Sequence, residues 1–143
     1  MEISNQPKLK FHGVNFMNVD LKVKKHYDNK AKIDLNIEPK VFYPSANKKC
    51  FEIVMGVSIA CKDFFYLKVL GLGWFEIIGD LENDDLKKSF VNANAPAIMF
   101  PYVRAFITTL TSNLGDKVTG AIIIPTQFFK GDLTEITETD EKV

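Results

Sequence analysis

A long amphipathic segment, residues 95–115, constrains the fold of this chain more than any other part of the sequence. Its large apolar residues recur every three or four positions, which places them on one stripe of an α-helix. These residues are Met99, Val103, Phe106, Ile107, Leu110 and Leu114. Pro101 suits the first turn of a helix, where its missing N–H has no helical partner, and Gly115 suits a C-terminal cap. The segment therefore predicts one helix with an apolar face against the core.

The opposite face of this predicted helix is small and only weakly polar. It carries Ala105, Thr108, Thr109 and Ser112. A solvated helix face more often carries lysine and glutamate. Small residues allow a second helix to approach closely, so we expect these four residues to form an interface with another subunit.

Four strand-like segments precede the helix. They cover residues 9–24, 33–37, 51–61 and 64–78. The apolar alternation of the first segment changes phase twice, near Gly13 and near Phe16, which predicts two bulges or bends.

The connections between these segments are short. Lys62 and Asp63 predict a tight turn between the last two strands, Pro39 is expected to end the second strand, and Gly71 and Gly73 predict a bulge or kink in the last one. Short connections favour antiparallel pairing. Strands followed by a helix therefore predict an α+β domain with an antiparallel sheet.

The rest of the chain is expected to be less regular. Residues 80–94 predict a polar loop with at most one helical turn. Residues 131–143 carry five acidic residues and are predicted to be a disordered tail. This leaves residues 1–130 as one domain, as the length of the chain suggests.

Composition and motifs argue against an enzyme and against nucleic-acid binding. The formal net charge is zero, and the ten lysines of residues 1–49 are interleaved with five acidic residues. A solvated sheet face explains that pattern better than a phosphate-binding patch. No sequence motif pairs His12 or His26 with a nucleophile or carboxylate, and no P-loop, zinc or dinucleotide pattern occurs in the sequence. We therefore expect no catalytic residue, metal site, cofactor or nucleic-acid partner.

The sequence also predicts the cellular compartment. No apolar run reaches the length of a membrane span, and the first residues lack the apolar region of a signal peptide. Cys50 and Cys61 are therefore expected to be reduced thiols in a cytoplasmic protein that does not insert into membranes.

Four stretches resemble a known family. They are KIDLN at residues 32–36, GWFEIIG at 73–79, the helical segment at 95–115 and IIIPTQFF at 122–129. The most specific part is the series Pro96, Phe100, Pro101, Tyr102 and Arg104. In chain order, the stretches resemble the crossover segment, the end of the sheet, the first helix and the following segment of SecB-type protein-export chaperones.

The resemblance implies a SecB-like fold, in which a four-stranded antiparallel sheet carries one long helix on one face. It also implies a homotetramer, a dimer of dimers assembled through the long helix, without a catalytic site or a cofactor. Only fourteen residues follow Phe129. The second helix of the family is therefore expected to be shortened or absent here.

The family holds unfolded polypeptides in grooves lined by apolar and aromatic side chains and then hands them on, usually to the SecA motor. By this resemblance, the client-binding groove is expected to contain Tyr27, Ile33, Leu35, Phe42, Tyr43, Phe128 and Phe129. Ordinary core packing is the alternative role for these residues. The two roles are equally open for Ile33 and Leu35, and core packing is favoured for Phe128 and Phe129.

Three functions are compatible with the sequence. The leading hypothesis is an ATP-independent holdase that keeps unfolded preproteins competent for export through the Sec pathway, with SecA as a candidate partner. The second is a dedicated SecB-like chaperone for one client, such as the antitoxin of a toxin–antitoxin system, which would tolerate loss of the SecA-docking tail. The third is a scaffold or small-molecule-binding protein that keeps the fold without binding clients.

Overall fold

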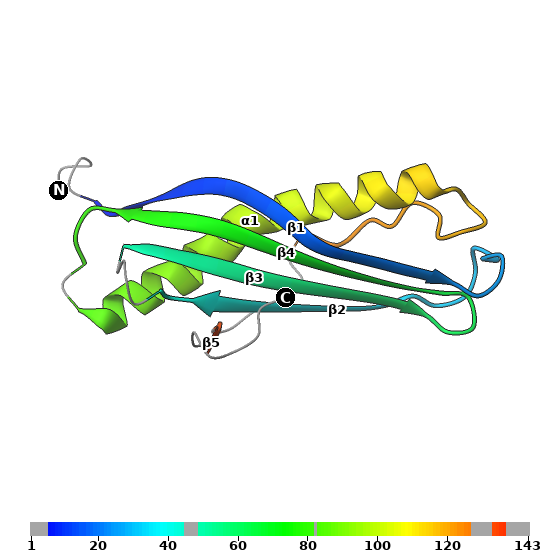
Figure 1. Ribbon diagram of the computed structural model, residues 1–143, viewed down its shortest axis with the longest axis horizontal. Coiled ribbons are helices and arrows are strands. Elements are labelled where there is room, and N and C mark those ends of the chain that lie inside the picture. The colour runs from blue at the N-terminus through cyan, green and yellow to red at the C-terminus, as the bar shows by residue number, and fades with distance from the viewer. Residues whose placement is uncertain (1–5, 45–48, 82, 127–132, 137–143) are drawn as a thin grey trace.

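An elongated sheet carries one long helix obliquely across a single face (Figure 1). The computed structural model describes residues 6–44, 49–81, 83–126 and 133–136. The elements are β1 (Lys8–Val23), β2 (Asp34–Phe42), β3 (Cys50–Cys61), β4 (Phe65–Ile78), α1 (Asp84–Leu114) and β5 (Thr134–Ile136). The predicted α+β class with one long helix is confirmed.

The sheet has five strands in the order β1-β4-β3-β2-β5. β1 to β4 pair antiparallel as predicted, but β5 pairs parallel with β2. The prediction of a four-stranded, purely antiparallel sheet is therefore wrong, because the end of the chain returns to the sheet and adds to the outer edge of β2. β5 lies inside the predicted disordered tail, while residues 137–143 lie outside the described residues. The division into a domain at 1–130 and a tail at 131–143 stays a prediction.

Two irregularities bend β1 against β4, as the phase changes predict. The pairing register shifts around Gly13 and again around Met17. β4 itself runs without interruption through Gly71 and Gly73. The bulge or kink predicted at these two glycines is therefore wrong, and the irregularities lie opposite them in β1.

Gly71 and Gly73 instead allow α1 to lie close to the sheet. Both lie on the buried face of β4. A Cβ atom added to Gly73 would stand 2.7 Å from the sulfur of Met99. Since atoms in a packed interior do not approach that closely, Met99 occupies the space that a side chain at position 73 would need.

α1 begins eleven residues earlier than predicted, at Asp84. The side-chain oxygen of Asn83 accepts a hydrogen bond from the Leu86 N–H at 2.8 Å and caps the first turn. Asp84 and Asp85 place negative charge at the positive end of the helix dipole. The polar loop predicted for residues 80–94 is therefore wrong from Asp84 onward, because capping and first-turn charge stabilise a helix there.

Two prolines lie inside α1, at positions 96 and 101. Pro101 is consequently not in the first turn, and each proline removes one main-chain hydrogen bond from the helix. The predicted end of the helix is confirmed, since α1 stops at Leu114 and Gly115 follows with a φ of 107°.

β2 continues through Pro39, which we expected to end it. Proline donates no N–H and is therefore tolerated mainly in strands at or near a sheet edge. On its outer side β2 has only the three residues of β5 as a neighbour among the described residues. Pro39 keeps its place opposite Met55 of β3.

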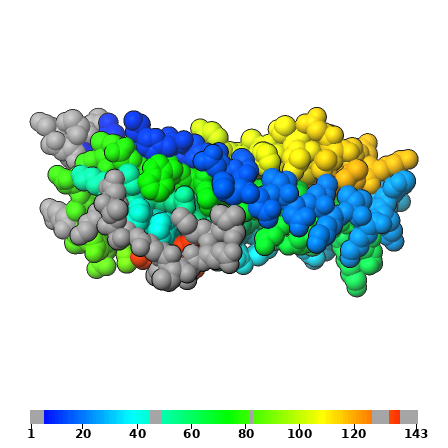
Figure 2. Space-filling model, in the orientation of Figure 1, coloured from blue at the N-terminus to red at the C-terminus, as the bar shows by residue number. Residues whose placement is uncertain are grey.

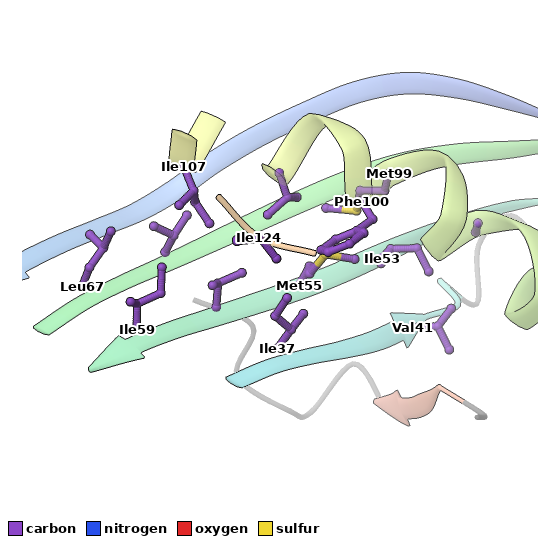
Figure 3. Packing of buried hydrophobic residues seen from close by; sticks show 14 of the residues in the cluster. Ile37, Val41, Ile53, Met55, Ile59, Leu67, Met99, Phe100, Ile107 and Ile124 are labelled. Carbon is purple, nitrogen blue, oxygen red and sulfur yellow. The ribbon is translucent and has the colours of Figure 1, made fainter. Parts of the chain in front are cut away.

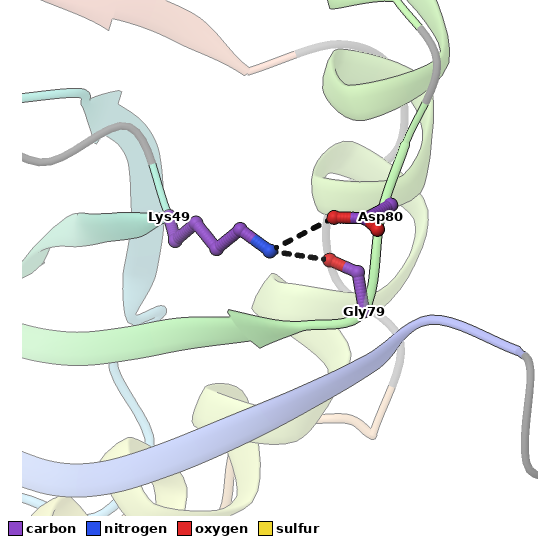
Figure 4. Close-up of polar contacts among 3 residues, drawn as sticks. All are labelled: Lys49, Gly79 and Asp80. Carbon is purple, nitrogen blue, oxygen red and sulfur yellow. Dashed lines mark hydrogen bonds and ion pairs between the residues drawn. The ribbon is translucent and has the colours of Figure 1, made fainter.

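The β3–β4 hairpin is fixed at both ends. The predicted turn at Lys62 and Asp63 is confirmed, and Asp63 takes a positive φ of 71° there. At the other end, Lys49 Nζ donates to the carbonyl of Gly79 at 3.0 Å and lies 3.1 Å from a carboxylate oxygen of Asp80 (Figure 4). Cys50 and Cys61, at the two ends of β3, are both buried.

The core lies between α1 and the sheet face that it covers (Figure 3). The helix supplies a fully buried row at four-residue spacing: Val91, Ala95, Met99, Val103 and Ile107. The central strands supply fully buried side chains that include Phe51, Ile53, Met55, Leu67 and Phe75. Part of the predicted stripe is thus confirmed, whereas Phe106 and Leu110 are only half-buried at its flank.

Candidate functional site

The predicted groove residue Tyr27 is fixed at one end of the sheet. Its N–H donates to the carbonyl of Lys117 at 2.8 Å, and its hydroxyl donates to the carbonyl of Ala31 at 3.2 Å. Its ring meets Phe64 and Phe65 edge-on, at centroid distances of 5.9 and 5.4 Å. The half-buried Tyr27 therefore fastens the β1–β2 connection to the loop after α1.

Ile33 and Leu35 lie at the start of β2, on the side of the sheet that α1 covers. Leu35 is paired with Ile59, whose side chain is fully buried. Ile33 and Leu35 are themselves half-buried and pack at the margin of the core, and the next residue on this face, Ile37, is buried. We call the side chains of Ile33, Leu35 and Ile37 the apolar strip. It runs from solvent into the core, so its role in client binding stays a prediction.

After α1 the chain runs back along the helix, and we call residues 121–124 the return segment. Thr108 Oγ1 donates to the carbonyl of Ile122 at 2.9 Å, and the N–H of Ile122 donates to Thr111 Oγ1 at 2.9 Å. Arg104 Nε donates to the carbonyl of Ile124 at 2.8 Å. Helix side chains thus bind the main chain of the return segment, while Ile122 and Ile124 are buried. Figure 3 shows Ile124 between α1 and β3.

The return segment also presents an apolar side chain to solvent. Ile123 is 76% exposed, more than any other large apolar residue that the structure describes. The sequence analysis missed this residue. The available signal was the short apolar run before Pro125, because an extended segment turns alternate side chains inward and outward.

The helix face predicted to form a subunit interface is partly occupied by the chain itself. Thr108 is half-buried because it contacts the return segment. Ala105, Thr109 and Ser112 are exposed. The interface role of these residues stays a prediction, and Thr108 has a contact within its own chain.

Phe42 and Tyr43 lie at the far end of β2. Phe42 is paired with Glu52, so its side chain points to the sheet face away from α1, and it is buried. The Tyr43 ring packs 5.9 Å from the ring of Phe51, and Lys87 Nζ lies 4.7 Å from the Tyr43 ring centroid. Phe42 and Tyr43 thus point to opposite faces of the sheet.

The Tyr43 hydroxyl is buried and has no hydrogen-bond partner among the described residues. Burial, and secondarily the carboxylate of Glu135, raise the pKa of Tyr43 to about 12. The hydroxyl therefore stays protonated at neutral pH, and it is a buried polar group that lacks compensation for its lost hydration.

β5 lies beside this end of β2. Residues 134–136 pair with residues 40–42, and Leu133 packs against the core. Glu135 forms an ion pair with Lys88 of α1 at 3.1 Å. The sequence analysis missed β5 as well.

The predicted groove residues therefore do not form one compact pocket. Tyr27, Ile33 and Leu35 lie at one end of β2, and Phe42 and Tyr43 lie at the other. At about 3.3 Å per residue, the nine residues of β2 separate the two groups by roughly 25–30 Å. Phe128 and Phe129 lie outside the described residues.

Among the described residues, no group of three or more side chains is placed to hold a metal ion. His12 Nε2 lies 3.6 Å from the carboxylate of Glu76, with both side chains more than a third exposed. The described part of the chain also contains no helix with the length and apolarity of a membrane span. What β2 offers is an apolar strip and main-chain groups near a sheet edge, the two features that extended peptides bind.

Residues 14–117 match the family described as preprotein translocase subunit SecB. This match covers more than half of the chain, so the chain belongs to the SecB family. The resemblance noted in the sequence is confirmed.

Individual proteins are similar to this chain in sequence or in fold. The chain is 31% identical over 120 residues to an uncharacterized protein of Methanocaldococcus jannaschii, covering 80% of this chain and 74% of the relative. Its fold is similar to that of a Mycobacterium tuberculosis SecB-like chaperone solved with a ChAD peptide from the HigA1 antitoxin, with a TM-score of 0.61 and 17% identity over 82% of this chain and 88% of that chain.

A protein of unknown function from Streptococcus agalactiae is also similar in structure. The TM-score is 0.50 and the identity 12%, over 84% of this chain and 98% of that chain. At such identities the two structural comparisons establish the shared fold alone.

Proposed function

We propose that this protein is an ATP-independent holdase that binds unfolded preproteins in the cytoplasm and keeps them competent for export through the Sec pathway, with SecA as a receiving partner. The observation that carries the proposal is the half-buried apolar strip near the sheet edge of a SecB-family chain. No cofactor is needed for such holding, because binding alone prevents refolding and aggregation.

The chemistry of an unfolded client complements β2. An unfolded chain exposes apolar side chains and unpaired main-chain groups. The apolar strip supplies contacts for the former, and the outer edge of β2 supplies partners for the latter. Several weak contacts along one chain add up to stable binding without requiring one fixed client sequence.

We propose that the protein works as a homotetramer, a dimer of dimers. From Ser89 to Leu114, the only charged residue of α1 is Arg104, and Arg104 is engaged by the return segment. The exposed face formed by Ala105, Thr109 and Ser112 is therefore uncharged and small, which suits close packing of one helix on another.

The free edge of the sheet continues this candidate interface. Among the described residues, β4 is the one strand that pairs with β1, and Met17, Val19 and Val23 of β1 are 51%, 44% and 46% exposed. Figure 2 shows β1 beside the C-terminal half of α1 on the surface. An exposed apolar edge strand is prone to pair with another chain, and a second protomer would cover it.

Co-elution tests the proposal. The full chain is mixed, without nucleotide, with a reduced and carboxymethylated polypeptide that cannot refold, and is then passed over a sizing column with mass detection. We expect a complex with the unfolded but not the native polypeptide, on an assembly of four 16.2 kDa chains. A folded protein that binds no unfolded polypeptide would overturn the holdase proposal, and an assembly of another size would overturn the tetramer.

A dedicated chaperone for one client is the second candidate. The similar M. tuberculosis protein, solved with an antitoxin peptide, is the observation that favours it. A dedicated chaperone should bind one natural partner at least about a hundredfold more tightly than unrelated unfolded chains, whereas a general holdase should bind them within about tenfold. Titration of several unrelated unfolded polypeptides distinguishes the two. A scaffold would bind none of them.

A further inference from the structure

β5 differs from the other four strands in how it is held. It has only three residues, and its pairing with β2 is the only parallel pairing among the described residues. Its ion pair, Glu135 with Lys88, leaves both side chains about half exposed. A half-exposed pair of this kind stabilises little, so the pairing with residues 40–42 and the apolar contact of Leu133 are the main described contacts of this segment.

β5 leaves one buried polar group next to it without a hydrogen-bond partner among the described residues. Val41 and Phe42 are buried, but the neighbouring Tyr43 hydroxyl is buried without a hydrogen-bond partner among the described residues. A permanent interface usually pairs such a group, because an unpaired buried hydroxyl is unfavourable.

The return segment shows what a permanent contact looks like in this molecule. There, Arg104, Thr108 and Thr111 bind successive main-chain groups with distances of 2.8 to 2.9 Å. No described side chain makes a comparable hydrogen bond to the main chain of β5. The return segment is bound by dedicated side chains of α1. β5 is bound by edge pairing with β2, which any extended chain can provide.

We propose that β5 occupies a strand-addition site on β2, and that an extended segment of a client displaces it. This proposal rests on the proposed function, since it assigns the chain's own C-terminal segment as a stand-in for the client. The site is self-occupied in the absence of client, so residues 133–136 act as an autoinhibitory strap.

Residues 133–136 indicate the chemistry of the client segment that would replace them. The segment is extended and parallel to β2, with an apolar residue in the place of Leu133 and a carboxylate two residues later to meet Lys88. Upstream of residue 40, β2 has no strand partner on its outer side among the described residues. A client segment that extends N-terminally beyond the residues equivalent to β5 can therefore pair with additional main chain of β2. Pro39 interrupts this pairing because it has no N–H, and pairing can resume beyond it.

Hydrogen exchange tests displacement directly. Amide exchange of the full chain is measured with and without a saturating reduced and carboxymethylated polypeptide. We expect exchange of residues 134–136 to accelerate at least about tenfold when client binds, while residues 40–42 stay protected by the incoming strand. If client binds at saturation and residues 134–136 keep their protection, the proposal of an autoinhibitory strap is wrong and the holdase proposal stands. If no unfolded polypeptide binds, both proposals fail together.

Two variants test autoinhibition. Glu135→Lys repels Lys88 and leaves Lys88 available to the client, and Leu133→Asp removes the apolar contact. Each is expected to tighten client binding about three- to tenfold, because a larger fraction of the protein has an open site. Asp116→Lys, an equal charge change at an exposed position after α1, is the control and should leave affinity unchanged. Unchanged or weaker client binding by both folded variants would show that β5 is a permanent strand.

A peptide added in trans completes the test. The synthetic peptide GDLTEITETDEKV, residues 131–143, should bind Glu135→Lys protein and compete with the client, and a scrambled peptide should not. Competition by neither peptide, or by both equally, would overturn the assignment of this segment as the stand-in.

Discussion

At the scale of single residues, Met99 occupies the space that a side chain at position 73 would need. Replacement of Gly73 by Ala forces the methionine to move, since the new Cβ would lie 2.7 Å from its sulfur. Overpacking of this kind costs about 1–3 kcal/mol of unfolding free energy, which urea unfolding measures. Gly56→Ala is the matched control, because nothing lies within 4 Å of a Cβ at that position. Equal losses in the two variants would contradict the packing argument.

The Tyr43 hydroxyl predicts a pH dependence. Its pKa is raised to about 12 in the folded chain, above an ordinary value of about 10. The folded state thus holds the proton more tightly, so the contribution to stability is full below pH 10 and is lost as the pH rises toward 12. Tyr43→Phe removes this dependence and leaves stability at pH 7 unchanged or higher, because the hydroxyl has no described partner. The difference between wild-type and variant unfolding curves, measured from pH 8 to 12, isolates the effect from titrating lysines. A constant difference would show that Tyr43 is not responsible.

The amino-acid sequence predicted some of these details but not others. The phase changes around Gly13 and Met17 predicted both irregularities of β1. In a strand with one buried face, an extra residue moves the apolar side chains to the alternate positions, and the sequence shows this change. The role of Gly73 was not predictable, since a close approach to Met99 depends on how a helix residue 26 positions away packs on the sheet.

At the scale of the elements, the start of α1 depends on local capping. Asn83→Ala removes the side-chain acceptor for the Leu86 N–H and should lower the unfolding free energy by about 1 kcal/mol. Asn94→Ala is the control, because Asn94 is an exposed residue inside α1 whose side chain donates to the carbonyl of Phe90. Thermal unfolding compares the two variants. A larger loss for Asn94→Ala would mean that the helix is not fixed by its cap.

The first turns of α1, all of β5 and the second half of β2 were not predicted. Their own residues do not indicate the tertiary contacts that stabilise them. The first turns of α1 are mostly polar, so periodicity alone favoured a loop, and the cap at Asn83 became informative only with the helix in view. β5 is only three residues long, TEI, which is too short for an alternating pattern to predict a strand there. The continuation of β2 through Pro39 depends on which edge of the sheet it occupies, which a local pattern does not encode.

At the scale of the whole molecule, the apolar strip carries the client-binding prediction. Paired replacement Ile33→Ser and Leu35→Ser should weaken capture of an unfolded polypeptide about tenfold, because two half-buried apolar contacts are lost together. The mass of the assembly should not change. Ile78→Ser, at an exposed apolar position of β4, is the control. A double variant that unfolds or dissociates would show that Ile33 and Leu35 belong to the core, and normal capture by a folded double variant would exclude them from the groove.

The overall architecture was more predictable than the site. Alternating strands followed by one amphipathic helix specify an α+β layer because each element must bury its apolar face against the other. The groove residues were assigned from resemblance, and β2 separates them into two groups at its opposite ends. Their distribution depends on how β2 crosses the molecule, which the identity of Tyr27, Leu35 or Tyr43 does not reveal.

The hydrogen bonds of the return segment have a consequence for how this chain tolerates change. Arg104, Thr108 and Thr111 recognise main-chain groups of Ile122 and Ile124, and every residue type carries those groups. In a saturation-mutagenesis scan, the three helix residues should therefore be intolerant of substitution, while the exposed position 123 accepts almost any side chain. The outward positions of this segment are free to diversify, so the protein can alter a surface next to its helix without disturbing the scaffold that holds it.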